Sequence, residues 1–149
     1  MKILETQNPL VSIIISIYMP DLSLLEKSLK SLVNQTYEPI EIIIINDGLK
    51  ESDLLFIKDL LAPYKNIIYI DNQTNQGLTR SLNKGIIASR GDFIARQDAD
   101  DISKITRIEK QVDHFKKNNE LGLLGTWYSV KFLENIVFYK PKGNKKELI

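Results

Sequence analysis

The order of apolar and polar residues along the chain predicts strands that alternate with helices. Four short, apolar runs rich in β-branched residues are typical of strands buried on both faces: residues 10–17, 40–45, 66–70 and 93–97. Each run precedes a stretch with apolar residues at helical spacing: about 22–35, 53–61, 78–89, and one marked by Ile105, Ile108, Val112 and Phe115. This alternation favours an α/β fold, a parallel sheet flanked by helices.

Local signals refine these elements. Ser23 and Glu26 form a capping-box pattern, which predicts the start of the first helix. Two more strands are expected at residues 121–130 and 136–139, with a hairpin across residues 131–135. The basic, turn-rich tail, residues 140–149, is expected to fray from the single predicted domain, residues 1–149.

Composition excludes several classes of protein. With 43% hydrophobic and 26% charged residues, the chain is typical of soluble globular proteins. A net charge of +1 gives no sign of a basic nucleic-acid-binding face. The absence of cysteine excludes disulfides and thiolate metal sites and fits a reducing compartment. No apolar run is long enough to span a bilayer.

Three carboxylates follow the fourth predicted strand: Asp98, Asp100 and Asp101. The alternation of side chains in a strand places Asp98 and Asp100 on the same side, where they repel each other unless a cation or several donors neutralise them. Mg²⁺ and Mn²⁺ take such oxygen ligands, often together with phosphate oxygens. One interpretation is therefore a metal-assisted phosphate or nucleotide site. The other is a polar turn, with Asp101 or Ser103 capping the next helix.

The ends of the other strands favour the first interpretation. Ligands of open α/β sheets bind outside the carboxyl ends of the strands. This rule places residues 16–19, 46–48 and 98–101 on one rim, and all three segments are polar or acidic. The P-loop and the dinucleotide fingerprint are both missing, which disfavours the common alternative nucleotide folds.

Five segments, in this order and at these spacings, strongly resemble the nucleotide-binding half of family 2 glycosyltransferases: residues 11–18, 42–48, 75–85, 91–94 and 97–101. The resemblance runs from about Val11 to Tyr128. It implies the GT-A fold, a Rossmann-like domain with a mostly parallel sheet flanked by helices, here truncated before the acceptor-binding half. It also implies a nucleotide-diphosphate sugar as donor, with a UDP sugar expected first.

The resemblance assigns roles to residues on the rim. Ser16 matches a position that contacts the nucleobase or ribose, and Tyr18 lies in the same nucleotide-binding segment. Asp47 matches an acidic residue that accepts a hydrogen bond from the base; the alternative is a turn-forming aspartate before Gly48.

The metal site and the third helix receive roles in the same way. Asp98 and Asp100 match the Asp-x-Asp motif of the family, which holds Mn²⁺ or Mg²⁺. We expect Asp100 to ligate the metal, Asp98 to contact the ribose or a water on the metal, and Asp101 to hold the loop or join the metal shell. A helix-start segment near the nucleotide is matched by Asn75, Gly77, Arg80, Asn83 and Gly85. Gly77 allows close approach of the backbone, whereas Arg80 faces either a phosphate or solvent.

Four residues further along are more ambiguous. Arg107 is similar to a basic position after the metal motif, with a structural ion pair as the alternative. His114 is expected at the surface or in packing rather than in catalysis. Trp127 and Tyr128 line either an acceptor site or the core.

The reaction that the resemblance implies is transfer of a glycosyl group with inversion to the hydroxyl of a saccharide or lipid-linked acceptor. The metal stabilises the departing diphosphate, and a general base takes the acceptor proton. In the family that base lies in an acidic motif of the later half of the protein. The acidic residues late in this chain, Glu120, Glu134 and Glu147, are isolated and do not form such a motif. We therefore expect the chain to bind the donor but to lack the base. Met19 and Ile105 also depart from the family, standing where asparagine and proline are usual.

The resemblance suggests surface polysaccharide synthesis in the cytoplasm or peripherally at the inner face of the membrane. A non-catalytic nucleotide-sugar-binding or assembly module, prone to self-association, is the main alternative. A nucleotidyltransferase is less favoured, because residues 16–21 form no glycine- and basic-rich loop.

Overall fold

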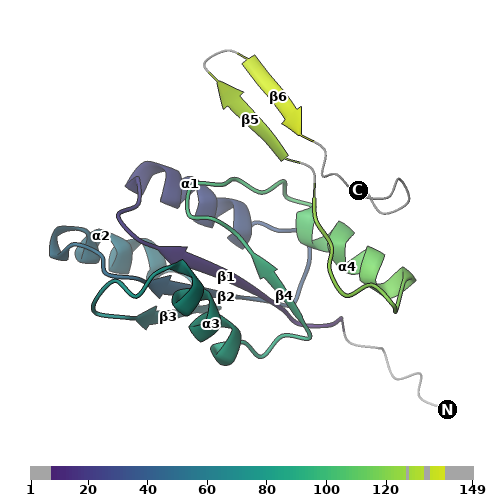
Figure 1. Ribbon diagram of the computed structural model, residues 1–149, viewed down its shortest axis with the longest axis horizontal. Coiled ribbons are helices and arrows are strands. Elements are labelled where there is room, and N and C mark those ends of the chain that lie inside the picture. The colour runs from purple at the N-terminus through teal and green to yellow at the C-terminus, as the bar shows by residue number, and fades with distance from the viewer. Residues whose placement is uncertain (1–7, 127, 133–134, 140–149) are drawn as a thin grey trace. The chain divides into compact units, whose positions relative to one another are not determined.

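The computed structural model describes residues 8–126, 128–132 and 135–139, in two compact units, Met1–Thr106 and Arg107–Ile149. The first unit contains a four-stranded parallel sheet in the order β3-β2-β1-β4 (Figure 1). Its strands are β1 (Val11–Ile17), β2 (Ile40–Asn46), β3 (Ile67–Asp71) and β4 (Phe93–Arg96). The predicted parallel α/β fold is confirmed, and at each end the four strands of this sheet differ from the predicted ones by at most one residue.

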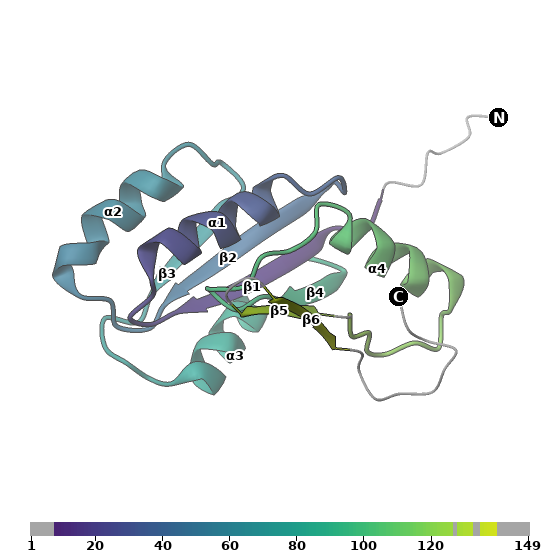
Figure 2. The ribbon, with the colours of Figure 1, turned by 90° about the horizontal axis from the view of Figure 1, so that it is seen from above.

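Helices cover both faces of this sheet. α1 (Leu22–Val33) and α2 (Glu51–Leu61) lie on one face, and α3 (Leu78–Ala88) lies on the other (Figure 2). Leu82 and Ala88 of α3 pack against the buried side chains of Ile14, Ile43 and Ile45. Because β1 and β2 are buried on both faces, their sequences are near-continuous apolar runs rather than alternating ones.

The N-cap of the first helix lies two residues before Ser23, the N-cap of the predicted capping box. The carboxylate of Asp21 accepts hydrogen bonds from the backbone N–H groups of Ser23 (2.9 Å) and Leu24 (3.0 Å), so Asp21 is the N-cap. Ser23 lies inside the first turn, and its predicted capping role is wrong. The negative charge of an aspartate suits the positive end of the helix dipole better than a hydroxyl does.

The amino end of the sheet contains a buried carboxylate. Glu41 is 3% exposed and accepts hydrogen bonds from the Ser12 hydroxyl (2.7 Å) and from the backbone N–H and the guanidinium of Arg90. Burial alone would raise the pKa of Glu41, but the hydrogen bonds from Ser12 and Arg90 hold it below its ordinary value. This network joins β1, β2 and the segment before β4.

The second unit contains α4 (Arg107–Lys117) and an antiparallel pair, β5 (Tyr128–Phe132) and β6 (Asn135–Tyr139). The hairpin is confirmed, but residues 121–126 form no strand; glycines at 122 and 125 explain this, since glycine weakens strands. Ile105 was expected on the fourth helix, yet it precedes α4 in a turn and is 55% exposed. Trp127 and the tail, residues 140–149, lie outside the described residues. None of the described helices is long and apolar enough to cross a bilayer.

Candidate functional site

A cavity of about 370 Å³ lies at the carboxyl ends of β1, β2 and β4. Residues predicted to form the site supply much of its lining: Ser16, Tyr18, Asp47, Asn75, Gly77, Asp98 and Asp100. They come from four separate segments of the chain: the end of β1 and the residues after it, the residue after β2, the start of α3, and the turn after β4. The structure therefore brings together the strand ends that the parallel-sheet rule placed on one rim.

Other predicted residues lie apart from this cavity. Arg80 and Asn83 are exposed on α3, and Asp101 is exposed beyond the carboxylate turn; none of them lines the cavity. Gly85 lies on the sheet side of α3, where an added Cβ would come within 2.5 Å of Ile14 Cγ2. This glycine lets the helix pack closely on the sheet.

Three predicted residues belong to the second unit. Arg107 is the first residue of α4, and His114 is half-buried further along the same helix. Tyr128 opens β5 with 58% of its surface exposed.

Asp98 and Asp100 are both exposed at the cavity. Asp98 also pairs with Arg96, with 2.5 Å between Asp98 Oδ1 and Arg96 Nη2, and both side chains are about half exposed. Within the described ranges, no group of three or more His, Cys, Asp or Glu residues is arranged to hold a metal ion. The donor set nevertheless suits Mg²⁺ or Mn²⁺, because such ions are commonly held by one or two carboxylates together with substrate phosphates and waters.

Neither Asp101 nor Ser103 caps α4, which begins only at Arg107. Instead the backbone N–H of Asp101 donates to the Asp98 carbonyl (3.2 Å) and closes a tight turn. The helix-capping interpretation of the carboxylates is therefore wrong.

Gln97 holds this turn in place, a role that the sequence analysis missed. The side chain is 4% exposed, and its Nε2 donates to Ser28 Oγ on α1 (2.8 Å) and to the Asp101 carbonyl (3.0 Å). Its Oε1 accepts from the Ser103 hydroxyl, and Ser28 Oγ also donates to the Asp98 carbonyl (3.3 Å). In the structure Ile94 and Arg96 are exposed and Gln97 is buried, as side-chain alternation continued past β4 gives; the sequence alone does not show this, because Ile94 is apolar.

Asp47 is 2% exposed, although it lines the cavity. Its Oδ1 accepts from the Gln76 backbone N–H (2.8 Å) and from Asn72 Nδ2 (2.9 Å), and its Oδ2 accepts from the Gly77 N–H (3.0 Å). Burial raises the pKa of this carboxyl, but these hydrogen bonds and one from the Ser81 hydroxyl outweigh burial and leave the pKa below its ordinary value.

The turn after β2 is formed by Asn46 rather than by Asp47. Asn46 Oδ1 accepts from the backbone N–H groups of Gly48 (3.0 Å) and Leu49 (2.7 Å), which is an Asx turn. The alternative role considered for Asp47, that of turn former, is thus filled by its neighbour.

Two lining residues have left-handed backbone conformations. Gly77 is the N-cap of α3, with φ +87° and ψ 155°, and no atom lies within 4 Å of the place of an added Cβ. Only glycine adopts this conformation readily, and the open space lets a ligand approach the backbone. Met19 has φ +45° and is 56% exposed. Asparagine, the residue that the family resemblance leads us to expect here, tolerates this conformation better than methionine does.

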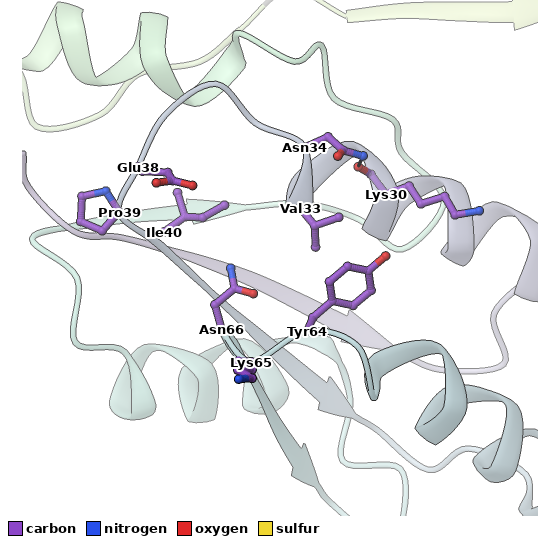
Figure 3. Close-up of a pocket in the computed structure, with 9 residues that line it drawn as sticks. All are labelled: Lys30, Val33, Asn34, Glu38, Pro39, Ile40, Tyr64, Lys65 and Asn66. Carbon is purple, nitrogen blue, oxygen red and sulfur yellow. Dashed lines mark hydrogen bonds between the residues drawn. The ribbon is translucent and has the colours of Figure 1, made fainter.

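A larger cavity, of about 680 Å³, lies at the amino ends of β2 and β3 (Figure 3). It contains none of the predicted site residues, and Glu38 is the single carboxylate in its lining. The Lys30 ammonium points away from the other lining residues in Figure 3 and is 2.6 Å from Glu26 Oε1. The smaller cavity is therefore the candidate site, because it gathers the acidic, hydroxyl and backbone groups.

Comparison with known proteins gives concordant matches. The profile described as Glycosyl transferase family 2 matches residues 12–144. A protein of Haemophilus influenzae described as an uncharacterized glycosyltransferase is 38% identical over 122 residues, which cover 82% of this chain and 38% of the relative. The UDP-Gal:alpha-D-GlcNAc-diphosphoundecaprenol beta-1,3-galactosyltransferase of Escherichia coli is 34% identical over 125 residues, which cover 83% of this chain and 46% of the relative. The chain thus spans less than half the length of these two relatives.

Solved structures show the same fold. The mannosyltransferase PcManGT from Pyrobaculum calidifontis, in complex with GDP-Man and Mn²⁺, matches with a TM-score of 0.64 and 16% identity, over 80% of this chain and 35% of the neighbour. TarS of S. aureus matches with a TM-score of 0.65 and 18% identity, over 73% of this chain and 20% of the neighbour. The arrangement of strands and helices is that of GT-A glycosyltransferases.

Proposed function

The chain belongs to glycosyl transferase family 2, and we propose that it is the donor-binding part of an inverting glycosyltransferase. It binds a nucleotide-diphosphate sugar together with Mn²⁺ or Mg²⁺, and the complete enzyme transfers the sugar to an acceptor hydroxyl. The observation that carries this proposal is the cavity at the carboxyl ends of the strands, where Asp98 and Asp100 lie with Ser16, Tyr18 and Gly77.

The lining divides into groups suited to different parts of the donor. The hydroxyls of Ser16 and Tyr18 suit the nucleoside, and the open backbone at Gly77 suits close approach of the ribose or diphosphate. Asp98 and Asp100 hold the divalent cation, which when bound supplies positive charge against the departing diphosphate. The roles of Arg80, Asn83 and Asp101 stay predictions.

One relative supports a proposal for the acceptor and the pathway. The Escherichia coli relative is named for UDP-Gal and a diphosphoundecaprenol-linked GlcNAc. We propose a UDP sugar, a saccharide or lipid-linked acceptor, and a role in surface polysaccharide synthesis. Because the relatives are more than twice as long as the matched part, we also propose that this chain alone binds the donor but transfers sugar poorly.

Calorimetric titration tests the donor site directly. UDP, GDP and dTDP are each titrated with Mn²⁺ and with EDTA, into the wild-type chain, Asp100→Asn and the control Asp59→Asn, which changes an exposed carboxylate on α2. We expect one nucleotide to bind with Mn²⁺, with affinity falling at least about tenfold in EDTA and in Asp100→Asn, but not in the control. Equal affinity with Mn²⁺ and EDTA, or no binding of any nucleotide, would overturn the proposal.

A further inference from the structure

β3 is one edge of the four-stranded sheet (Figure 1), and within the residues that the structure describes no strand pairs with its outer side. Its first four residues are Ile67, Ile68, Tyr69 and Ile70, and all four are partly exposed. Natural proteins protect such edges with charged residues, prolines or bulges. In β3 the one charged residue, Asp71, stands at the end of the strand, so the apolar middle of the edge is open to another strand.

The hydrogen bonds to β2 show which backbone groups of β3 point outward. The carbonyl of Asn66 accepts from the N–H of Ile42 (3.0 Å), and the N–H of Asn72 donates to the carbonyl of Asn46 (2.9 Å). Because the direction of the backbone groups alternates along a strand, the even-numbered residues of this stretch bond to β2 and the odd-numbered ones face away from it. The outward-facing residues of the strand are Ile67, Tyr69 and Asp71.

This alternation limits how a second copy of β3 can pair with the first. In an antiparallel pair, the outward-facing residues of the two strands must lie opposite each other. A two-fold axis at Ile68 meets this condition: it sets Ile67 opposite Tyr69 of the second copy and brings Lys65, two residues before β3, close to Asp71 of the second copy. Moving the axis by one residue in either direction keeps the hydrogen bonds but loses this pairing of opposite charges.

The same axis, perpendicular to the sheet, keeps α2 of both copies on one face. Because α2 connects β2 to β3, its counterpart would lie about two strand spacings away, or about 10 Å, which is a usual distance between packed helices. Leu55 and Phe56 of α2 are 69% and 38% exposed. These side chains give the two helices apolar surface for a contact.

We propose that β3 is a self-association surface, through which two copies of this chain join their sheets antiparallel, with Lys65 of each copy paired with Asp71 of the other. A second copy fits this edge because one strand carries both charges and the matching set of outward backbone groups. A single strand pair is a small interface, so we expect a dissociation constant on the order of 10–100 µM. β3 contributes no residue to the candidate site, and the inference does not depend on nucleotide binding.

Sedimentation velocity of the whole chain, from about 5 µM to about 1 mM, tests for the dimer, and hydrogen exchange at the two ends of this range locates it. We expect the outward N–H groups of Ile67 and Tyr69 to become at least about fivefold more protected at the high concentration. The N–H groups of Ile68 and Ile70, which face β2, should change less. A chain that stays monomeric, or a dimer in which Ile67 and Tyr69 gain no protection, overturns the proposal.

Charge reversal tests the register of the pair. Lys65→Glu brings two carboxylates together at each end of the strand pair, and Asp71→Lys brings two ammonium groups together. Each variant alone should therefore dimerise at least about tenfold more weakly than the wild type. An equal mixture of the two regains opposite charges at both ends and should form a heterodimer with an affinity close to that of the wild type. Lys27→Glu on α1 and Asp113→Lys on α4 make the same changes in net charge at exposed positions and should dimerise like the wild type.

The folding of each variant is checked first by circular dichroism, because Asp71 also accepts hydrogen bonds from Asn46 Nδ2 (3.1 Å) and the Gln73 N–H (2.7 Å). If Asp71→Lys does not fold, Lys65→Glu decides the register by itself, since Lys65 is exposed. A Lys65→Glu chain that dimerises as tightly as the wild type overturns the proposal. So does a mixture of two folded variants that associates no better than either variant alone.

Discussion

Replacing Gln97 with leucine tests whether hydrogen bonds to α1 hold the acidic turn in place. The glutamine side chain is 4% exposed and donates to Ser28 Oγ and to the Asp101 carbonyl, while it accepts from Ser103. Leucine is similar in size but has no polar group. The substitution therefore removes these three hydrogen bonds, together with a long one from Nε2 to Ser31 Oγ (3.5 Å), and changes packing little.

The expected loss can be estimated from these bonds. A hydrogen bond contributes about 0.5–1.5 kcal/mol net, so three contribute about 3 kcal/mol. Ser28 is fully buried, but its hydroxyl can still donate to the Asp98 carbonyl, which limits any additional penalty. We expect Gln97→Leu to lower the free energy of unfolding by about 2–4 kcal/mol and to weaken metal-dependent nucleotide binding.

Urea unfolding followed by far-UV circular dichroism measures the first effect, and calorimetry at a temperature where both proteins are folded measures the second. Gln73→Leu is the matched control, since Gln73 is exposed, and should change stability by less than about 0.5 kcal/mol. If Gln97→Leu unfolds at the same urea concentration as the control, the hydrogen bonds contribute nothing net. If it is less stable but binds the nucleotide as tightly as the wild type, Gln97 does not set the position of the acidic turn.

Three further predictions follow from the fold and the cavity. Gly77→Ala should lower stability by about 1–3 kcal/mol through backbone strain at φ +87°, which thermal melting measures. The added Cβ would also enter the open space beside the backbone, so nucleotide binding measured by calorimetry should weaken, and unchanged affinity would contradict this second effect. Gly85→Val should lower stability by about 1–3 kcal/mol through overlap with Ile14, and an unchanged urea midpoint would show that α3 can move away from the sheet. Folding lowers the pKa of Glu41. As the pH falls to about 4, the ordinary pKa of a carboxyl group, and below, the unfolded chain therefore binds more protons than the folded chain. The free energy of unfolding should therefore be constant above that pH and fall below it, with a shallower fall in Glu41→Gln when unfolding is measured from pH 7 to pH 3.

The sequence was sufficient for the fold because the central strands are buried on both faces and appear as unbroken apolar runs. The rim was predictable for a related reason: parallel strands end at the same edge, so the polar residues after each strand had to meet. Helix starts were less certain, since Ser23 and Asp21 both fit the local rules and only the backbone geometry selects Asp21.

Long-range hydrogen bonds could not be predicted in the same way. The hydrogen-bond partners of Asp47 lie at positions 72, 76 and 77, and no local pattern links them to it. Gln97 likewise finds Ser28 on a helix from the other end of the unit. Such contacts depend on how the helices pack over the sheet, so the sequence does not show which groups of the protein a residue in a binding motif will also bond.

The place of β4 in the sheet also determines the order in which the site can be assembled. β1 and β2 are joined by a single helix, whereas Val11 of β1 pairs with Phe93 of β4 across most of the first unit. Pairings between distant parts of a chain carry the larger loop-closure cost and form late. During synthesis, β1, β2 and β3 can therefore associate while β4 is still being made. We expect a nascent chain that stops before Gln97 to possess most of the apolar core but to lack Asp98 and Asp100, the two carboxylates of the proposed metal site.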